Sequence, residues 1–81
     1  MSNIKHKELD ERDFQIIFTL AKNNMRATET AYELDIHRGT VLYRMEKIKN
    51  LTGLDPANFY DLHELVKMAE DKLRTKGRRL S

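Results

Sequence analysis

Residues 28–45 read TETAYELDIHRGTVLYRM, and this stretch decides the fold. Its first part is short and amphipathic, and it carries a small residue, Ala31, where two crossing helices approach most closely. A polar corner, Asp35-Ile36-His37, separates it from a second helix-like segment that opens with Arg38. This order is typical of a helix-turn-helix, in which the first helix packs across the second and the second offers its N-terminal side chains to the major groove.

The boundaries of both helices follow from the residues at their ends. Thr28 is the expected N-cap of the first, because its hydroxyl can accept a hydrogen bond from a following backbone N–H. Asp35 stands where many such turns use glycine, so we expect a left-handed conformation there. The second helix should run over residues 38–51 and end at Thr52-Gly53. Its inward stripe is made of Val41, Met45 and Ile48.

A further helix is expected before this unit, from Asp10 to Asn23-Asn24, with acidic residues in its first turn. It carries two apolar strips, one of which can cover the helix-turn-helix while the other needs a different cover. The first strip is Phe14, Ile17, Phe18 and Ala21, and the second is Ile16 and Leu20.

A last helix is expected over residues 58–74, after the turn at Asp55-Pro56. Its apolar face is formed by Leu62, Leu65, Val66, Ala69 and Leu73. The fold class is therefore all-α, a small helix-turn-helix domain of about four helices. We expect a flexible N-terminus at 1–9, a domain at 10–74 with its helix-turn-helix core at 28–51, and a basic flexible tail at 75–81.

The length of 81 residues makes one small domain, which buries roughly 60% of the surface of its unfolded chain and is marginal alone. There is no cysteine, so neither a disulfide nor a cysteine-based zinc site can stabilise it. Burial of surface against a second copy is the simplest remedy. No segment has the ~18 consecutive apolar residues of a membrane span, and the N-terminus lacks the apolar core of a signal peptide. We expect a cytoplasmic, nucleoid-associated protein.

The net charge is only +2, but it is unevenly distributed. Residues 36–54 hold four basic side chains (Arg38, Arg44, Lys47, Lys49) and one acidic, Glu46. A basic stripe over a DNA-reading helix is the expected electrostatic signature of a phosphate binder.

From Thr28 to Asp55 the chain resembles the C-terminal DNA-binding domain of PucR-type and sugar-diacid (CdaR-type) transcription factors, and more distantly the Fis nucleoid protein. The matching residues are Glu29-Thr30-Ala31, Leu34, Ile36-His37-Arg38, Thr40, Tyr43-Arg44, Ile48 and Leu51-Thr52-Gly53-Leu54-Asp55. The resemblance implies DNA binding. Gly39 departs from it, since a polar residue is usual there, and the large sensory region of those regulators is absent, so ligand sensing is not implied.

Each exposed residue of the helix expected over residues 38–51 can then be given a chemical role. Arg38 can bond bidentately to guanine or to a phosphate, and Thr40 suits a phosphate or a thymine methyl group. Tyr43 can reach a phosphate or a sugar, and Gly39 lets the backbone lie close to DNA. The backbone N–H groups at the start of the preceding helix, near Thr28, can hold another phosphate. The expected DNA-binding residues are Thr28, His37, Arg38, Thr40, Tyr43, Arg44 and Lys47.

Several of these residues have structural alternatives. Arg44 can pair with Glu33 or with another carboxylate of the domain instead of a phosphate. The Tyr43 ring can pack on the last helix, and His37 can serve as a helix-start or turn residue. The basic tail can be a minor-groove arm or an ordinary solvated terminus.

The leading interpretation is a sequence-specific regulator that binds double-stranded DNA, as a homodimer through its first and last helices. The alternative is a protein-interaction module on the same scaffold, which blocks or recruits another regulatory protein. We expect no enzyme, because there is no cysteine nucleophile, no glycine-rich phosphate loop and no acid–base pair in a recognisable arrangement. No cofactor or metal is expected either, since His6, His37 and His63 form no ligand cluster.

Overall fold

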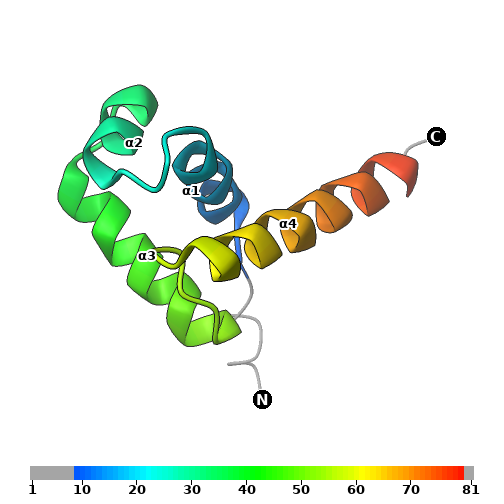
Figure 1. Cartoon of the computed structure of the whole chain (residues 1–81). Coiled ribbons are helices and arrows are strands. Elements are labelled where there is room, and N and C mark those ends of the chain that lie inside the picture. The colour runs from blue at the N-terminus through cyan, green and yellow to red at the C-terminus, as the bar shows by residue number, and fades with distance from the viewer. Residues whose placement is uncertain (1–8, 80–81) are drawn as a thin grey trace, which may run out of the picture.

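The computed structural model of the chain describes the backbone of residues 9–79 and the side chains of residues 9–74. This part forms four helices and no strand, which confirms the all-α fold class. In chain order they are α1 (Glu11–Lys22), α2 (Ala27–Leu34), α3 (Arg38–Thr52) and α4 (Phe59–Arg79). Helices α2 and α3 lie on one side of α1, and α4 lies on the other side and extends away from the body (Figure 1).

Helix α1 begins with a capping box. The Asp10 side chain accepts a hydrogen bond from the Asp13 N–H, and the Asp13 side chain accepts one from the Asp10 N–H, each at 2.9 Å. The helix ends at Asn23, as expected, and Asn24 and Met25 then turn the chain with positive φ values of 55° and 67°. The predicted extent of this helix is confirmed to within one residue at its start.

Helix α2 starts one residue before Thr28, so the prediction that Thr28 is its N-cap is wrong. The turn at Asn24 and Met25 redirects the chain early, and the Arg26 N–H donates to the Asn23 carbonyl at 3.1 Å. Arg26 therefore occupies the N-cap position, without a side-chain cap, and Thr28 lies exposed within the first turn.

Helix α4 starts as predicted but ends later. Asn58 caps it, since its side-chain oxygen accepts from the Asp61 N–H at 3.0 Å and its carbonyl from the Leu62 N–H at 2.8 Å. The helix continues to Arg79 and not to the expected 74, because residues 75–79 include no proline and a single glycine costs only about 1 kcal/mol. Residues 1–8 of the expected flexible N-terminus and the last two of the tail lie outside the described residues, while Leu9 packs against the core.

The core receives side chains from all four helices. Ala31, Val41 and Ile48 are buried as predicted, and Met45 packs against them. Helix α4 supplies the second cover that the two apolar strips of α1 were expected to need. The first strip is less buried than expected, because Ala21 is exposed and Phe14 and Phe18 are only half-buried. Buried apolar residues of α1 and α4 are Ile16, Ile17, Leu20, Leu62, Leu65 and Ala69.

Candidate nucleic-acid interface

A tight left-handed turn fixes the angle between α2 and α3. Asp35 has φ 58° and ψ 47°, the left-handed conformation expected from the sequence, and its N–H donates to the Tyr32 carbonyl at 3.2 Å. The Ile36 N–H donates to the Ala31 carbonyl at 3.0 Å. Ala31 itself is only 5% exposed, so its small side chain sets how closely the two helices approach.

The N-terminal half of α3 lies open to solvent. His37 occupies the N-cap position with extended backbone angles, and its carbonyl accepts from the Thr40 N–H at 3.0 Å, but its side chain makes no cap bond. Arg38, Gly39 and Thr40 are exposed, and Tyr43 is 68% exposed. The first turn of α3 has no acidic residue, so its backbone N–H groups present an undiminished positive helix dipole.

Arg38 and Tyr43 are available for contacts outside the domain. Among the described residues Arg38 makes no ion pair or side-chain hydrogen bond, and its exposed guanidinium stands at the positive end of α3. The exposure of the Tyr43 ring disagrees with the alternative that it packs on the last helix, because a ring buried against α4 would not be two-thirds solvated.

Arg44 and Lys47 face α1 instead. The Arg44 Nη1 atom lies 2.9 Å from Oδ1 of Asp10 and 3.0 Å from Oδ1 of Asp13. The Lys47 Nζ atom lies 2.8 Å from Oδ2 of Asp13 and 3.5 Å from Oδ2 of Asp10. Both basic side chains are only about a quarter exposed (24% and 25%), and Asp13 is fully buried. These four side chains, named here the α1–α3 ion cluster, join the start of α1 to the middle of α3.

The charges of the cluster hold one another in the ionised state. Partial burial raises the pKa of Asp10, but the Asp13 N–H and the Arg44 guanidinium, with help from Lys47, lower it to about 2. The hydrogen bond to Asp13 raises the pKa of Lys47. Burial lowers the pKa of Arg44, and its bonds to Asp13 and Asp10 raise it further than that, so the net direction is upward.

Glu33, the expected alternative partner of Arg44, pairs with another residue. Its carboxylate bonds to Lys22 Nζ and, at 3.2 Å, to the Asn23 side chain. These two hydrogen bonds lower the pKa of Glu33. The salt bridge ties α2 to the end of α1, so Arg44 is left to the aspartates on the other end of α1.

Thr28 lines a shallow hollow of about 410 Å³ on α2, to which α3 contributes no residue. The hollow is lined by Asn23, Thr28, Glu29, Tyr32 and Glu33. Tyr32 is 89% exposed, and the sequence interpretation overlooked it. It stands four residues after Thr28 on one helical face, and this spacing was the signal that could have found it.

The outer face of α3 also holds residues that were not chosen as contacts. Glu46, Lys49 and Asn50 are all exposed there. Glu46 and Asn50 follow Tyr43 by three and seven residues, which is the helical repeat. Periodicity alone could therefore have included them.

No helix in the described part of the chain is both long enough and apolar enough to cross a membrane. The same described residues contain no group of three or more His, Asp or Glu side chains placed to hold a metal ion. The side chains of the basic tail, residues 75–81, lie outside the described side chains, so its role as a DNA arm stays a prediction.

Two helices joined by a tight left-handed turn, with an open, basic start to the second, define a helix-turn-helix of the DNA-binding class. The chain belongs to the family of PucR C-terminal helix-turn-helix domains, whose pattern it matches over residues 15–67. This confirms the resemblance found in the sequence. The family consists of DNA-binding domains of transcriptional regulators and not of enzymes.

Two relatives match part of this chain. The transcriptional activator PmfR of Paenarthrobacter nicotinovorans is 44% identical over 48 residues, which cover 59% of this chain and 10% of that protein. The carbohydrate diacid regulator of Escherichia coli (strain K12) is 45% identical over 40 residues, or 49% of this chain and 10% of that protein. The chain thus spans about a tenth of the length of these curated relatives. No solved structure matches it significantly, and the more distant resemblance to Fis has no support in these comparisons.

Proposed function

We propose that this domain binds double-stranded DNA sequence-specifically and regulates transcription by placing α3 in the major groove. The observation that carries the proposal is the division of α3 into two faces. One face is held against α1 by the α1–α3 ion cluster. The other exposes Arg38, Thr40 and Tyr43 near the helix start, where the side chains of a recognition helix read bases.

Each residue of the proposed contact set, Thr28, His37, Arg38, Thr40 and Tyr43, has a specific role in the DNA complex. Arg38 supplies two parallel donors that match the O6 and N7 atoms of guanine, or a phosphate. Thr40 and Tyr43 offer hydroxyl groups to phosphates. His37, at the turn between α2 and α3, lies beside the DNA backbone. Thr28 and the free N–H groups of the first turn of α2 supply a further phosphate contact.

Arg44 and Lys47 take a different place in this proposal from the one expected at first. Their ion pairs with Asp10 and Asp13 support a positioning role, in which they set the rotation of α3 about its axis. Only about a quarter of each side chain is exposed. Their contribution to DNA affinity is therefore smaller than that of Arg38.

We infer further that the regulator acts as a homodimer, through the helices that were expected to pair, α1 and α4. A two-fold axis would set two recognition helices one DNA turn apart, ~34 Å, so that the operator has two half-sites in inverted order. The small size of the domain supports this inference, because a second copy adds buried surface. The proposed location is the cytoplasm, at the nucleoid.

The experiment is a titration of the purified chain onto selected and random duplexes at two salt concentrations. We expect preference for the selected sequence and an affinity that falls steeply with salt. Arg38→Ala should weaken binding to the selected site by about 10- to 100-fold. Lys72→Ala, an exposed lysine of α4, serves as the control and should leave binding nearly unchanged. An unchanged affinity in Arg38→Ala would remove the recognition-helix assignment.

The second candidate function is a protein-interaction module that blocks or recruits another regulator. The exposed apolar side chains at the junction of α1 and α4 favour it. Failure of the chain to bind any of the duplexes, even at low salt, would count against the DNA-binding proposal and favour this alternative.

A further inference from the structure

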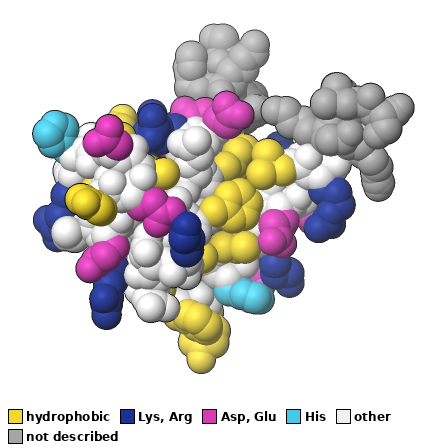
Figure 2. All heavy atoms as spheres, turned by 90° about the horizontal axis from the view of Figure 1, so that it is seen from above, with side chains coloured by type: hydrophobic (Ala, Val, Ile, Leu, Met, Phe, Trp, Pro, Cys, Tyr) yellow, Lys and Arg dark blue, Asp and Glu magenta, His cyan; other side chains and the backbone are white. Residues whose placement is uncertain are grey.

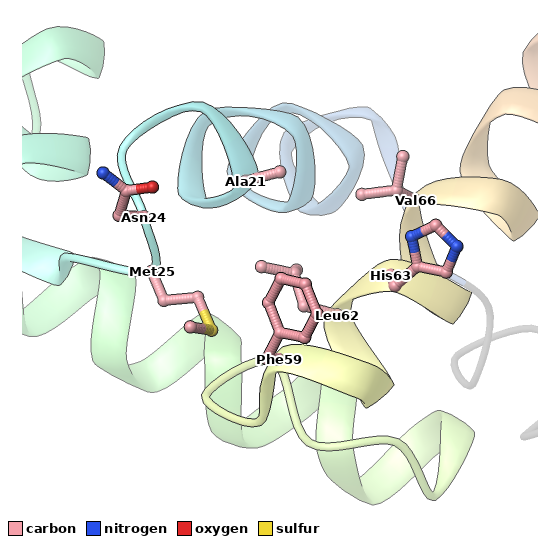
Figure 3. Close-up of a pocket in the computed structure, with 7 residues that line it drawn as sticks. All are labelled: Ala21, Asn24, Met25, Phe59, Leu62, His63 and Val66. Atoms are coloured by element: carbon pink, nitrogen blue, oxygen red, sulfur yellow. The ribbon is translucent and has the colours of Figure 1, made fainter.

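An apolar pocket of about 220 Å³ opens at the surface between the end of α1 and the start of α4. Figure 3 shows Met25 extending toward Phe59 and Leu62, with His63 and Val66 further along α4. The lining residues are Ala21, Asn24, Met25, Phe59, Leu62, His63 and Val66. Seen from above, the hydrophobic side chains gather in a band on this side of the molecule (Figure 2).

One face of α4 continues this pocket along the helix. Phe59, His63, Val66, Glu70 and Leu73 follow one another at alternating spacings of four and three residues, so they share a single stripe, named here the α4 seam. Phe59 is 63% exposed and Leu73 is 40% exposed. His63 and Glu70 are exposed, and Val66 is half-buried. The seam lies beside the residues of α4 that pack on α1, and Val66 belongs to both surfaces, since it also packs against the core.

The second half of α4 has little of its own chain to pack on. Ala69 is the last fully buried residue of the helix among the described side chains, and Leu73, one turn later, is partly exposed. In Figure 1 this half projects away from the other three helices. Because α4 is 21 residues long and extends beyond the other helices, the far end of the seam is open to contact with another molecule.

The chemistry of the seam is self-complementary when the helix is reversed. Its order is apolar, histidine, apolar, glutamate, apolar, with Val66 at the centre. Against an antiparallel copy, Phe59 meets Leu73, His63 meets Glu70 and Val66 meets Val66. Within the described residues neither His63 nor Glu70 makes an ion pair, so both are available to an opposite partner.

We propose that the α4 seam seats a second copy of this chain, antiparallel, with a two-fold axis that passes beside Val66. Leu73 of each copy fills the pocket rim next to Phe59 of the other at the two ends of the seam, and a His63–Glu70 pair lies between each end and the central Val66. Knob-into-hole packing at this spacing brings helix axes to about 8–10 Å. The inference deepens the proposed dimeric DNA reader and rests on it. The two domains, each with its α3, then lie on opposite sides of the α4 pair.

Cysteine cross-linking tests the position of the axis. Because the chain has no cysteine, Val66→Cys introduces a single thiol, and a disulfide needs Cα atoms within about 7 Å of each other. Mild oxidation of Val66→Cys should convert most of the protein into a covalent dimer. Glu64→Cys, exposed on another face of α4, is the matched control and should stay monomeric in denaturing gels. Equal cross-linking of the two variants, or cross-linking of the control alone, would overturn the proposed register.

Charge reversal tests the pairing of His63 with Glu70, without DNA present. In the His63→Glu variant, the new carboxylate of each copy faces Glu70 of the other copy, so the dimer contains two repulsive pairs. The dimer dissociation constant should rise about tenfold in sedimentation equilibrium. The double variant His63→Glu with Glu70→Lys restores opposite charges and should restore dimerisation. Glu64→Lys is the control and should leave the dissociation constant unchanged. All of these side chains are exposed, so the fold, checked by circular dichroism, should be retained.

The outcome separates this inference from the proposed function. A monomer at micromolar concentration, or a double variant no better than His63→Glu, would refute the seam. Recruitment of a different protein to the wild-type seam without self-association would refute it as well. Binding of a single half-site by the His63→Glu variant, measured separately, would show that the DNA-reading assignment survives such a failure.

Discussion

The carboxylate of Asp13, near the start of α1, accepts a hydrogen bond from Lys47 Nζ at 2.8 Å, although the two residues are 34 positions apart in the chain. Asp13 is fully buried, while Lys47 keeps a quarter of its side chain exposed. A buried carboxylate of this kind is tolerated only when cations and N–H groups surround it. Here Lys47, Arg44 and the Asp10 N–H supply those groups, and the recognition helix is thereby fixed to α1.

Asp13→Ala should destabilise the domain strongly. The substitution leaves Arg44 and Lys47 without their buried partner and removes half of the capping box, so we expect a loss of about 3 kcal/mol in the free energy of unfolding. Urea denaturation followed by circular dichroism measures it. Gln15→Ala, exposed on the same helix, is the control and should change stability by less than about 0.5 kcal/mol. A loss for Asp13→Ala no larger than the control would show that the cluster does not hold α3.

Asp10→Asn should give a stability difference that depends on pH. The pKa of Asp10 is lowered from 3.8 to about 2 in the folded chain, so its charge stabilises the fold above about pH 4. This contribution is lost as the pH falls from about 4 to below 2. Because Asp10 is half-exposed, the difference at neutral pH should be no more than about 1 kcal/mol. Asparagine can also cap the helix, so the difference in stability between the two proteins reports the charge of Asp10 and not the loss of the cap.

Unfolding curves at several pH values measure this difference. The wild type and Asp10→Asn should converge in stability at the acid end. A gap of constant size from pH 7 to pH 2 would contradict the ionic origin of the effect.

Local signals predicted most of the fold. Helices α1, α2 and α3 end where expected, because Asn24, Asp35 and Gly53 are residue types that tolerate the left-handed conformation that each adopts there. The buried side of α3 followed from its period. The neighbours of α1 did not, because periodicity says which residues share a face and not which helix that face meets.

The same limit applied to the candidate site. The sequence showed that Arg38, Thr40 and Tyr43 lie on the surface, and they do. The partners of Arg44 were not predictable, since Asp13 is 31 positions away and becomes a neighbour only after α1 has packed on α3. Glu33 was the nearer choice, but its carboxylate is taken by Lys22.

Asp35→Gly should stabilise the domain slightly. Asp35 holds φ 58° and ψ 47°, where a side chain costs energy that glycine does not. We expect a gain of about 0.5 kcal/mol, reduced by the greater entropy of the unfolded glycine. Thermal unfolding measures it. Asp35→Val, with a β-branched residue in the same conformation, should lose stability. If both variants unfolded at the same temperature, the turn would not carry this strain.

Thr30→Val should also stabilise the fold. The Thr30 hydroxyl is fully buried, and among the described residues its Oγ1 atom has no hydrogen-bond partner. Valine keeps the shape and removes the unsatisfied group, so we expect a gain of about 1 kcal/mol. Thr30→Ala removes the hydroxyl too but leaves a small cavity, and it should gain less or lose stability. A clear loss for Thr30→Val in denaturant titration would mean that the hydroxyl has a partner.

Gly39→Ala should separate folding from DNA binding. A Cβ atom at Gly39 meets no atom within 4 Å, and alanine favours the helix, so the free domain should gain about 0.5 kcal/mol. In the proposed complex the Gly39 backbone lies close to DNA, and the added methyl group should weaken binding about fivefold, with a larger loss for Gly39→Val. Fluorescence anisotropy on the selected duplex, beside urea unfolding, measures both effects. Lys72→Ala, exposed on α4, is the control for a general surface change. Unchanged affinity in both Gly39 variants would place the backbone away from the DNA, and Arg38 would then have to reach it by side-chain length alone.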